Sequence, residues 1–162
     1  MSVNEPAWLA EARKNLGVTE IKGPKTNDFI SRWLVGLAAW WSDDETPWCA
    51  AFVGGCLEAV GITCSRFESA RSYESWGSPL SAPLYGCIVT FTRDGGGHVG
   101  FVVGRDASGN LMVLGGNQGD AVNVKAFPRS RATAYRWPMG VPADVGAPLP
   151  LLAAAELSTN EA

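Results

Sequence analysis

The sequence predicts an α+β domain in which N-terminal helices pack on a mainly antiparallel sheet of five strands. Up to about residue 76 the apolar residues recur at helical spacing, whereas from residue 87 to residue 137 apolar and polar residues alternate as in strands. Helices that precede a run of strands are typical of α+β domains. A length of 162 residues suits one domain with a sizeable core.

The helical part of the chain divides into four predicted helices, at residues 5–16, 28–41, 47–60 and 69–76. In the first of them, Leu9, Ala12 and Leu16 share one face, which we expect to be buried. Gly17 and Gly61 follow the first and third helices, where glycine favours the left-handed conformation that ends a helix. Asn4 is the N-cap candidate of the first helix.

The second half of the chain predicts strands at 87–92, 98–104, 110–115, 121–127 and 132–137, separated by turns rich in Gly, Asn, Asp and Pro. Residues 78–86 are predicted as a Pro-rich connection in front of them. After Pro138 the composition becomes Pro/Ala-rich. We therefore expect one domain over residues 1–138 and a mobile tail over residues 139–162.

The third helix carries a thiol in its first turn. Thr46 is a good N-cap residue, and Pro47 suits the first helical position. Cys49 begins an apolar stripe that continues through Phe52, Val53, Cys56, Leu57 and Val60. The positive end of a helix dipole lowers the pKa of a thiol, and the thiolate is the nucleophile. The alternative is that Cys49 is one more small apolar residue on a buried stripe.

His98 is the chain's only histidine and stands where a glycine-rich loop opens into a strand. On that strand His98 shares a face with Gly100 and Val102. Gly100 has no side chain, which leaves room for a helix end to approach. A Cys at a helix start and a His at a strand start, far apart in sequence, are what a thiol protease brings together.

A third polar residue is expected to orient the imidazole of His98. Asn117 is the first candidate, because it lies in the polar turn that follows the predicted strand at 110–115. Gln118 and Asp120 in the same turn are the alternatives, and Asn110 is a weaker one. Asn117 also has a purely structural reading, since asparagine tolerates the left-handed geometry of turns.

Three ordered segments carry a resemblance to a known family: Trp48 to Val53, Gly96 to Phe101, and Gly116 to Gln118. They resemble the NlpC/P60 and CHAP superfamily of papain-like cysteine cell-wall hydrolases, and most nearly a phage-associated branch of it. The likeness covers about residues 6–138. Relatives tend to have an acidic residue after the glycine that precedes the first strand, whereas this chain has Cys87 after Gly86.

The resemblance implies a papain-like fold with Cys49 as nucleophile, His98 as base and Asn117 as the orienting residue. It implies an endolysin-like hydrolase of peptidoglycan that cleaves an amide in the stem peptide, with no metal or cofactor. A superfamily cleft is expected to place Cys49 among substrate-binding side chains, namely Trp48, Asp94, Gln118 and Asp120. Their acidic and amide groups suit a stem peptide that contains a diamino acid, which favours an endopeptidase.

Other functions stay open on the sequence. They are an N-acetylmuramoyl-L-alanine amidase, a thiol deamidase or acyltransferase-type toxin, and a non-enzymatic module that binds the virion or the wall. A formal net charge of −3 and the absence of any Lys/Arg cluster argue against nucleic acid as a partner. No apolar run reaches the length of a membrane span, and we expect a monomer.

The four cysteines show no C-x-x-C pair, and with a single histidine they do not form a zinc motif. Cys56 and Cys87 are predicted as buried apolar residues, while a disulfide from Cys64 to either of them stays open. The first residues lack the basic and apolar regions of a signal peptide. We therefore expect synthesis in the bacterial cytoplasm and access to the wall by holin-type release or within a virion.

Overall fold

The computed structural model describes residues 5–18, 48–65, 70–93, 96–116, 118 and 121–152. These ranges contain two α-helices, α1 (Ala7–Arg13) and α3 (Cys49–Ala59), and two 3₁₀ helices, η1 (Ala70–Ser75) and η2 (Arg129–Arg131). The strands are β1 (Ser78–Leu80), β2 (Ile88–Arg93), β3 (Gly96–Arg105), β4 (Leu111–Gly115), β5 (Asn123–Phe127) and β6 (Ala132–Trp137). The α+β class is therefore confirmed. The helix predicted at 28–41 lies outside the described residues, as do Asn4, Thr46 and Pro47.

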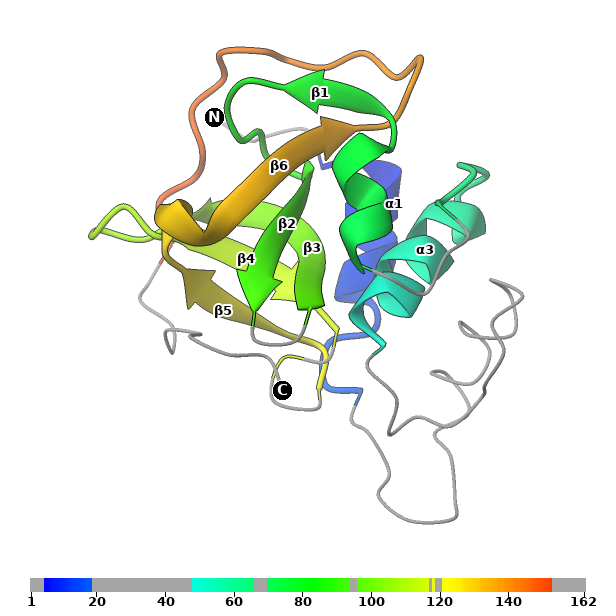
Figure 1. Ribbon diagram of the computed structural model, residues 1–162, viewed down its shortest axis with the longest axis horizontal. Coiled ribbons are helices and arrows are strands. Elements are labelled where there is room, and N and C mark those ends of the chain that lie inside the picture. The colour runs from blue at the N-terminus through cyan, green and yellow to red at the C-terminus, as the bar shows by residue number, and fades with distance from the viewer. Residues whose placement is uncertain are drawn as a thin grey trace.

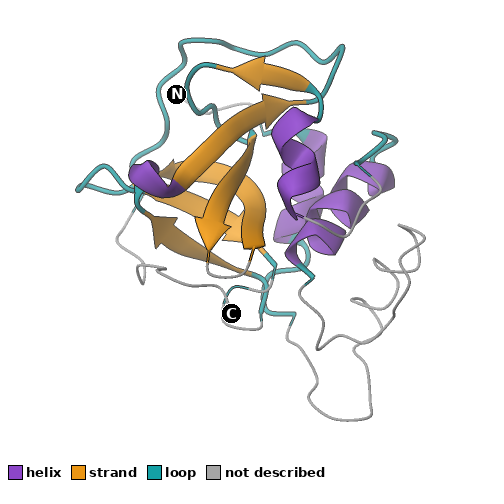
Figure 2. Ribbon diagram, viewed as in Figure 1, coloured by secondary structure: helices purple, strands orange, loops and turns teal. Residues whose placement is uncertain are grey.

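All strands form one antiparallel sheet in the order β1-β6-β2-β3-β4-β5. Helices α1, α3 and η1 lie together along one side of it (Figures 1 and 2). The arrangement places α3 beside strands β3 and β4. Within the described ranges, no helix combines the length and apolar character needed to cross a bilayer.

The sheet has six strands, so the prediction of five is wrong. The additional strand is β1, which falls in the predicted Pro-rich connection and pairs with β6, with Ser78 opposite Trp137. Pro79 is compatible with this position because β1 is an edge strand, where a residue without an N–H is tolerated. A strand of three residues is too short to show an alternating pattern.

Helix α3 begins at Cys49 and is more deeply buried than a one-sided stripe requires. Its residues from Cys49 to Gly54 are all buried, including the alanines between the stripe positions. The reason is that α3 packs against both α1 and the sheet, where Phe52 meets the ring of Phe101 edge-on at 6.3 Å. Gly61 has a φ of +81° just after the helix, as predicted for the residue that ends it.

Helix α1 is shorter than predicted, and its inner face is different. Trp8, Leu9 and Ala12 are buried, but Leu16 is 45% exposed, so its predicted burial is wrong. The helix ends at Arg13 because the following residues form turns. There Gly17, at a φ of +92°, donates its N–H to the oxygen of Val122 instead of extending the helix.

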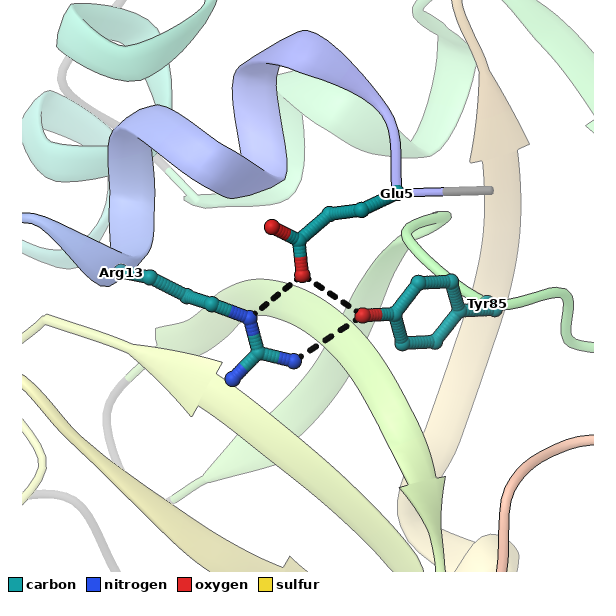
Figure 3. Close-up of polar contacts among 3 residues, drawn as sticks. All are labelled: Glu5, Arg13 and Tyr85. Atoms are coloured by element: carbon teal, nitrogen blue, oxygen red, sulfur yellow. Dashed lines mark hydrogen bonds and ion pairs between the residues drawn. The ribbon is translucent and has the colours of Figure 1, made fainter. Parts of the chain in front are cut away.

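A polar cluster ties both ends of α1 to the turn before β2 (Figure 3). Arg13 Nε donates to Glu5 Oε1 at 2.6 Å, and Tyr85 Oη donates to the same oxygen at 2.7 Å. Partial burial raises the pKa of Glu5, but the hydrogen bonds from Tyr85 and Arg13 outweigh it and hold that pKa below its ordinary value. Trp8 Nε1 adds a buried hydrogen bond of 2.8 Å to the oxygen of Gly86. This end of the sheet is therefore anchored to the helix layer.

The described part of the predicted tail, residues 139–152, runs around the outside of the sheet (Figure 1). Its end pairs with the end of β3, where Arg105 N–H donates to Pro150 O and Leu152 N–H donates to Arg105 O, both at 2.8 Å. Gly104 permits this approach, because a Cβ there would lie 2.6 Å from the oxygen of Pro150. Residues 153–162 of the tail lie outside the described residues.

Candidate active site

Cys49 is the first residue of α3 and Trp48 is its N-cap, so the helix starts two residues later than predicted and the thiol still lies in its first turn. Its side chain is buried at 4% exposure. The first N–H groups of a helix have no intrahelical acceptor and point out of its N-terminal end, where the helix dipole is positive. A carbonyl oxygen that becomes negatively charged beside Cys49 would therefore meet amide N–H groups of this turn.

His98 lies on β3 in an aromatic setting that restricts its ring. The ring is nearly parallel to that of Phe127, with centroids 5.5 Å apart and planes at 9°. Phe91, its partner across the β2–β3 ladder, packs at 6.4 Å and 23°. With only 1% of its surface exposed, His98 has a defined orientation.

A hydrogen bond of 3.0 Å joins His98 Nε2 to Gln118 Oε1. The orientation of the Gln118 amide follows from its other contacts: its Nε2 donates to the oxygen of Val113 at 3.2 Å and to both the main-chain oxygen and Oδ1 of Asn123 at 2.9 Å. The reverse orientation would set the amide oxygen against three acceptors. Gln118 Oε1 is therefore the acceptor, so neutral His98 carries its proton on Nε2 and Nδ1 is the unprotonated nitrogen.

Two consecutive glycines link the imidazole to the start of α3. A Cβ on Gly115 would lie 2.5 Å from Gln118 Oε1 and 3.4 Å from His98 Nε2. A Cβ on Gly116 would lie 2.6 Å from the ring of Trp48 and 2.7 Å from the Cβ of Phe52. The end of β4 thus fits between the imidazole of His98 and the start of α3 only because Gly115 and Gly116 have no side chains. The start of α3, the start of β3 and the end of β4 accordingly lie at the same end of the molecule in Figure 1.

The role expected for Gly100 is wrong. The nearest neighbours of Gly100 are strand residues: a Cβ there would lie 2.6 Å from Val113 Cγ1 and 3.1 Å from the oxygen of Leu114, both on the neighbouring strand β4. The close approach of a helix occurs at Gly116. A glycine in the sequence indicates that another segment packs closely against the backbone there. Which segment this is depends on the twist of the sheet in the folded protein.

Of the other predicted site residues that the structure describes, Gln118 contacts His98, whereas Trp48 is buried and Asn110 lies elsewhere. Trp48, expected to wall the cleft, has 0% exposure and packs its ring against Gly116, so it offers no surface to a substrate in this structure. Asn110 is bound to Asp106 in the turn at the far end of β3. Gln118, expected to bind substrate and also weighed as an orienting residue, contacts His98.

Asn117, Asp94 and Asp120 lie outside the described residues. Asn123 and the two rings beside His98, those of Phe91 and Phe127, were not predicted as site residues from the sequence. Phe91 had a usable signal, because its position in a hairpin with the histidine strand makes it the cross-strand neighbour of His98. No sequence pattern pointed to Asn123, because its contact with Gln118 depends on the conformation of the turn between β4 and β5.

Two of the remaining thiols, Cys56 and Cys87, are in environments that suppress their ionisation. Burial raises the pKa of the Cys87 thiol to about 12, and it raises that of Cys56 as well. None of the four cysteines is in a disulfide, so the bridge from Cys64 left open by the sequence is not formed. Among the described residues, no group of three or more Cys, His, Asp and Glu side chains is arranged to hold a metal ion.

Alkylation of the native protein with iodoacetamide at mildly alkaline pH is expected to modify Cys49 first. Cys56 and Cys87 should react at least about 100-fold more slowly, because only the thiolate reacts and burial keeps these groups protonated. Peptide mass mapping over time gives the four rates, and the same reaction in denaturant should level them. Preferential modification of Cys64 in the native protein would contradict an activated Cys49.

Comparison with known proteins finds a likeness to one family. The family model of the CHAP domain matches residues 41–117, a segment that includes Cys49 and His98 and ends one residue before Gln118. The match confirms the resemblance to the NlpC/P60 and CHAP superfamily, and the observed α+β fold is compatible with a papain-like architecture. CHAP domains are typically hydrolases of peptidoglycan, which indicates that general activity and substrate for this chain. A comparison with curated proteins finds no matching relative.

Proposed function

We propose that this chain is a cysteine endopeptidase that cleaves an amide bond within the stem peptide of peptidoglycan. One observation carries the proposal. Inside the CHAP match, the only histidine is held in a single tautomer by Gln118, at the end of the molecule where a helix begins with Cys49. A nucleophile, a base and a group that orients the base are the parts that thiol catalysis needs.

In the proposed reaction, His98 Nδ1 takes the proton of the Cys49 thiol, and the thiolate attacks the amide carbonyl carbon. The resulting oxyanion is stabilised by N–H groups at the start of α3. His98 then gives its proton to the leaving amine as the carbon–nitrogen bond breaks, which leaves a thioester on Cys49. His98 next takes a proton from water, and the hydroxide attacks the thioester carbon. The carbon–sulfur bond breaks to release the acid product, and His98 returns its proton to the Cys49 thiolate.

Gln118 has the orienting role in this mechanism, in place of Asn117. Its carbonyl oxygen bonds Nε2–H of the neutral ring and continues to accept from the imidazolium formed during the reaction. A thiolate suits an amide carbonyl, whereas glycoside hydrolysis ordinarily requires two carboxylates that flank the bond. Asp94 and Asp120 remain proposed contacts for the amino group of the stem peptide.

Digestion of purified murein tests the bond that is cleaved. We expect new amino termini within the stem peptide and no new reducing sugars, both identified by mass spectrometry of the soluble products. The Cys49→Ala variant provides the blank. Release of intact stem peptides from muramic acid would indicate the amidase instead, and new reducing ends would contradict both. If no murein is solubilised but a protein glutamine is deamidated, the toxin alternative holds.

The route to the wall is a separate part of the proposal. We propose an endolysin-like role in which the protein reaches the wall by holin-type release or within a virion. Expression in the bacterial cytoplasm should leave cells intact, and co-expression with a membrane-permeabilising holin should lyse them. Lysis of cells without any holin would contradict the need for this release.

A further inference from the structure

Asn123, at the start of β5, is bound to Gln118 through both ends of its side-chain amide. Its Nδ2 donates to the main-chain oxygen of Gln118 at 2.8 Å, and its Oδ1 accepts from Gln118 Nε2 at 2.9 Å. The two residues therefore form a reciprocal pair. It holds the backbone and the side chain of Gln118 at the same time, within the turn that joins β4 to β5.

Gln118 needs such support to act on an imidazole. Its side chain has three rotatable bonds, and fixing a chain of this kind costs conformational entropy. The residue also lies between two strands, outside the sheet ladder, and its N–H donates to the oxygen of Ala121 at 3.0 Å. Hydrogen bonds at the end of the side chain and at the main-chain oxygen restrict both the side chain and the backbone of Gln118. A functional side chain keeps its orientation only when its supporting contacts hold it in place.

We propose that Asn123 is a positioning residue that acts on His98 through Gln118. It keeps Gln118 Oε1 against Nε2 of the imidazole, which retains the ring proton on Nε2 and leaves Nδ1 as the base. The effect of Asn123 on catalysis rests on the proposed function. The chain of hydrogen bonds from Asn123 through Gln118 to His98 does not. Oxygens of Val113 and of the Asn123 main chain also accept from Gln118, so loss of the Asn123 side chain should loosen the arrangement without reversing the amide.

Two substitutions at this position separate the roles of its side-chain ends. Asn123→Ala removes both side-chain bonds to Gln118. Asn123→Asp keeps the shape and the acceptor but removes the donor, and it places a carboxylate beside the Gln118 main-chain oxygen. The matched control is Asn110→Ala, because Asn110 is also a part-buried asparagine with a side-chain bond in a turn, 3.0 Å from Asp106, at the far end of β3.

The single histidine makes the measurement direct, since ¹⁵N-labelled protein has one pair of imidazole nitrogen signals. In the wild type we expect the proton on Nε2 and slow exchange of that proton with water. In Asn123→Ala and Asn123→Asp we expect exchange at least about 10-fold faster. The kcat of both variants for murein solubilisation should fall on the order of 10-fold with little change in KM. The reason is that the imidazole is less well oriented toward the thiol while substrate binding is retained. Asn110→Ala should change neither quantity.

The outcomes distinguish this proposal from the proposed function. Wild-type exchange of the ring proton in Asn123→Ala, or a wild-type protein with its ring proton on Nδ1, would overturn the positioning role. A protein that digests no murein, yet shows faster ring-proton exchange in the Asn123 variants alone, would uphold the positioning role and overturn the proposed activity.

Discussion

Replacement of Cys49 by alanine is expected to reduce murein hydrolysis at least about 1,000-fold while the protein remains folded. His98→Ala should have an effect of the same order, because the nucleophile and the base act as one unit and removal of either leaves only substrate binding and oxyanion stabilisation. The rate of murein solubilisation gives the activity, and circular dichroism with thermal unfolding verifies the fold. His98→Gln serves as a second variant, since it roughly preserves the volume of this buried side chain.

The matched control for the thiol is Cys56→Ala, on the same helix and also buried. It should lose about 1–3 kcal/mol of unfolding free energy but retain its turnover. The double variant Cys49→Ala, His98→Ala should be no slower than either single variant. Activity of Cys49→Ala above a few per cent of wild type would exclude the thiolate mechanism.

Trp48→Ala is expected to cost about 3–5 kcal/mol of unfolding free energy, the usual result of emptying a fully buried tryptophan site. Trp48 is the N-cap residue of α3 and its ring packs against Gly116, so its loss leaves a cavity next to the start of the helix. Urea unfolding followed by fluorescence and circular dichroism measures the change. Loss of activity should follow the loss of folded protein, without a selective rise in KM.

Trp48→Phe should be milder, because most of the ring volume is retained. Trp76→Ala is the matched control at an incompletely buried tryptophan, and its loss of stability should be smaller. If Trp48→Ala kept wild-type stability and raised only the KM for murein, Trp48 would line the substrate cleft as the sequence analysis expected. The experiment therefore distinguishes a structural role of Trp48 in the core from a role in substrate binding.

Local features of the chain were sufficient to predict most of the fold. The five predicted strands, observed as β2 to β6, all lie within two residues of their predicted ranges, because alternation is a property of each segment alone. The end of α3 before Gly61 was also predicted, since terminal residues and helical periodicity act over one or two turns, whereas its start at Cys49 lies two residues after the predicted one. Strand β1 was missed because its pairing with β6 arises only across the chain.

The orienting residue shows the limit of the sequence in the site. Asn117 and Gln118 are neighbours in one polar turn, and their chemistry is nearly the same. What brings Gln118 to His98 is the set of acceptors on its other side, contributed by Val113 in β4 and Asn123 in β5. No pattern within the turn carries that information.

The sequence by itself determined that a thiol begins a helix, that a lone histidine begins a strand, and that polar residues follow the next strand. These are consequences of residue type and spacing, and they act within a few residues. Only the tertiary structure decided that Trp48 lies in the core, that Gly116 rather than Gly100 admits the helix, and that Gln118 meets the imidazole. Each of these depends on packing and register between segments distant in the chain, because burial and hydrogen-bond partners are properties of the contact and not of either segment.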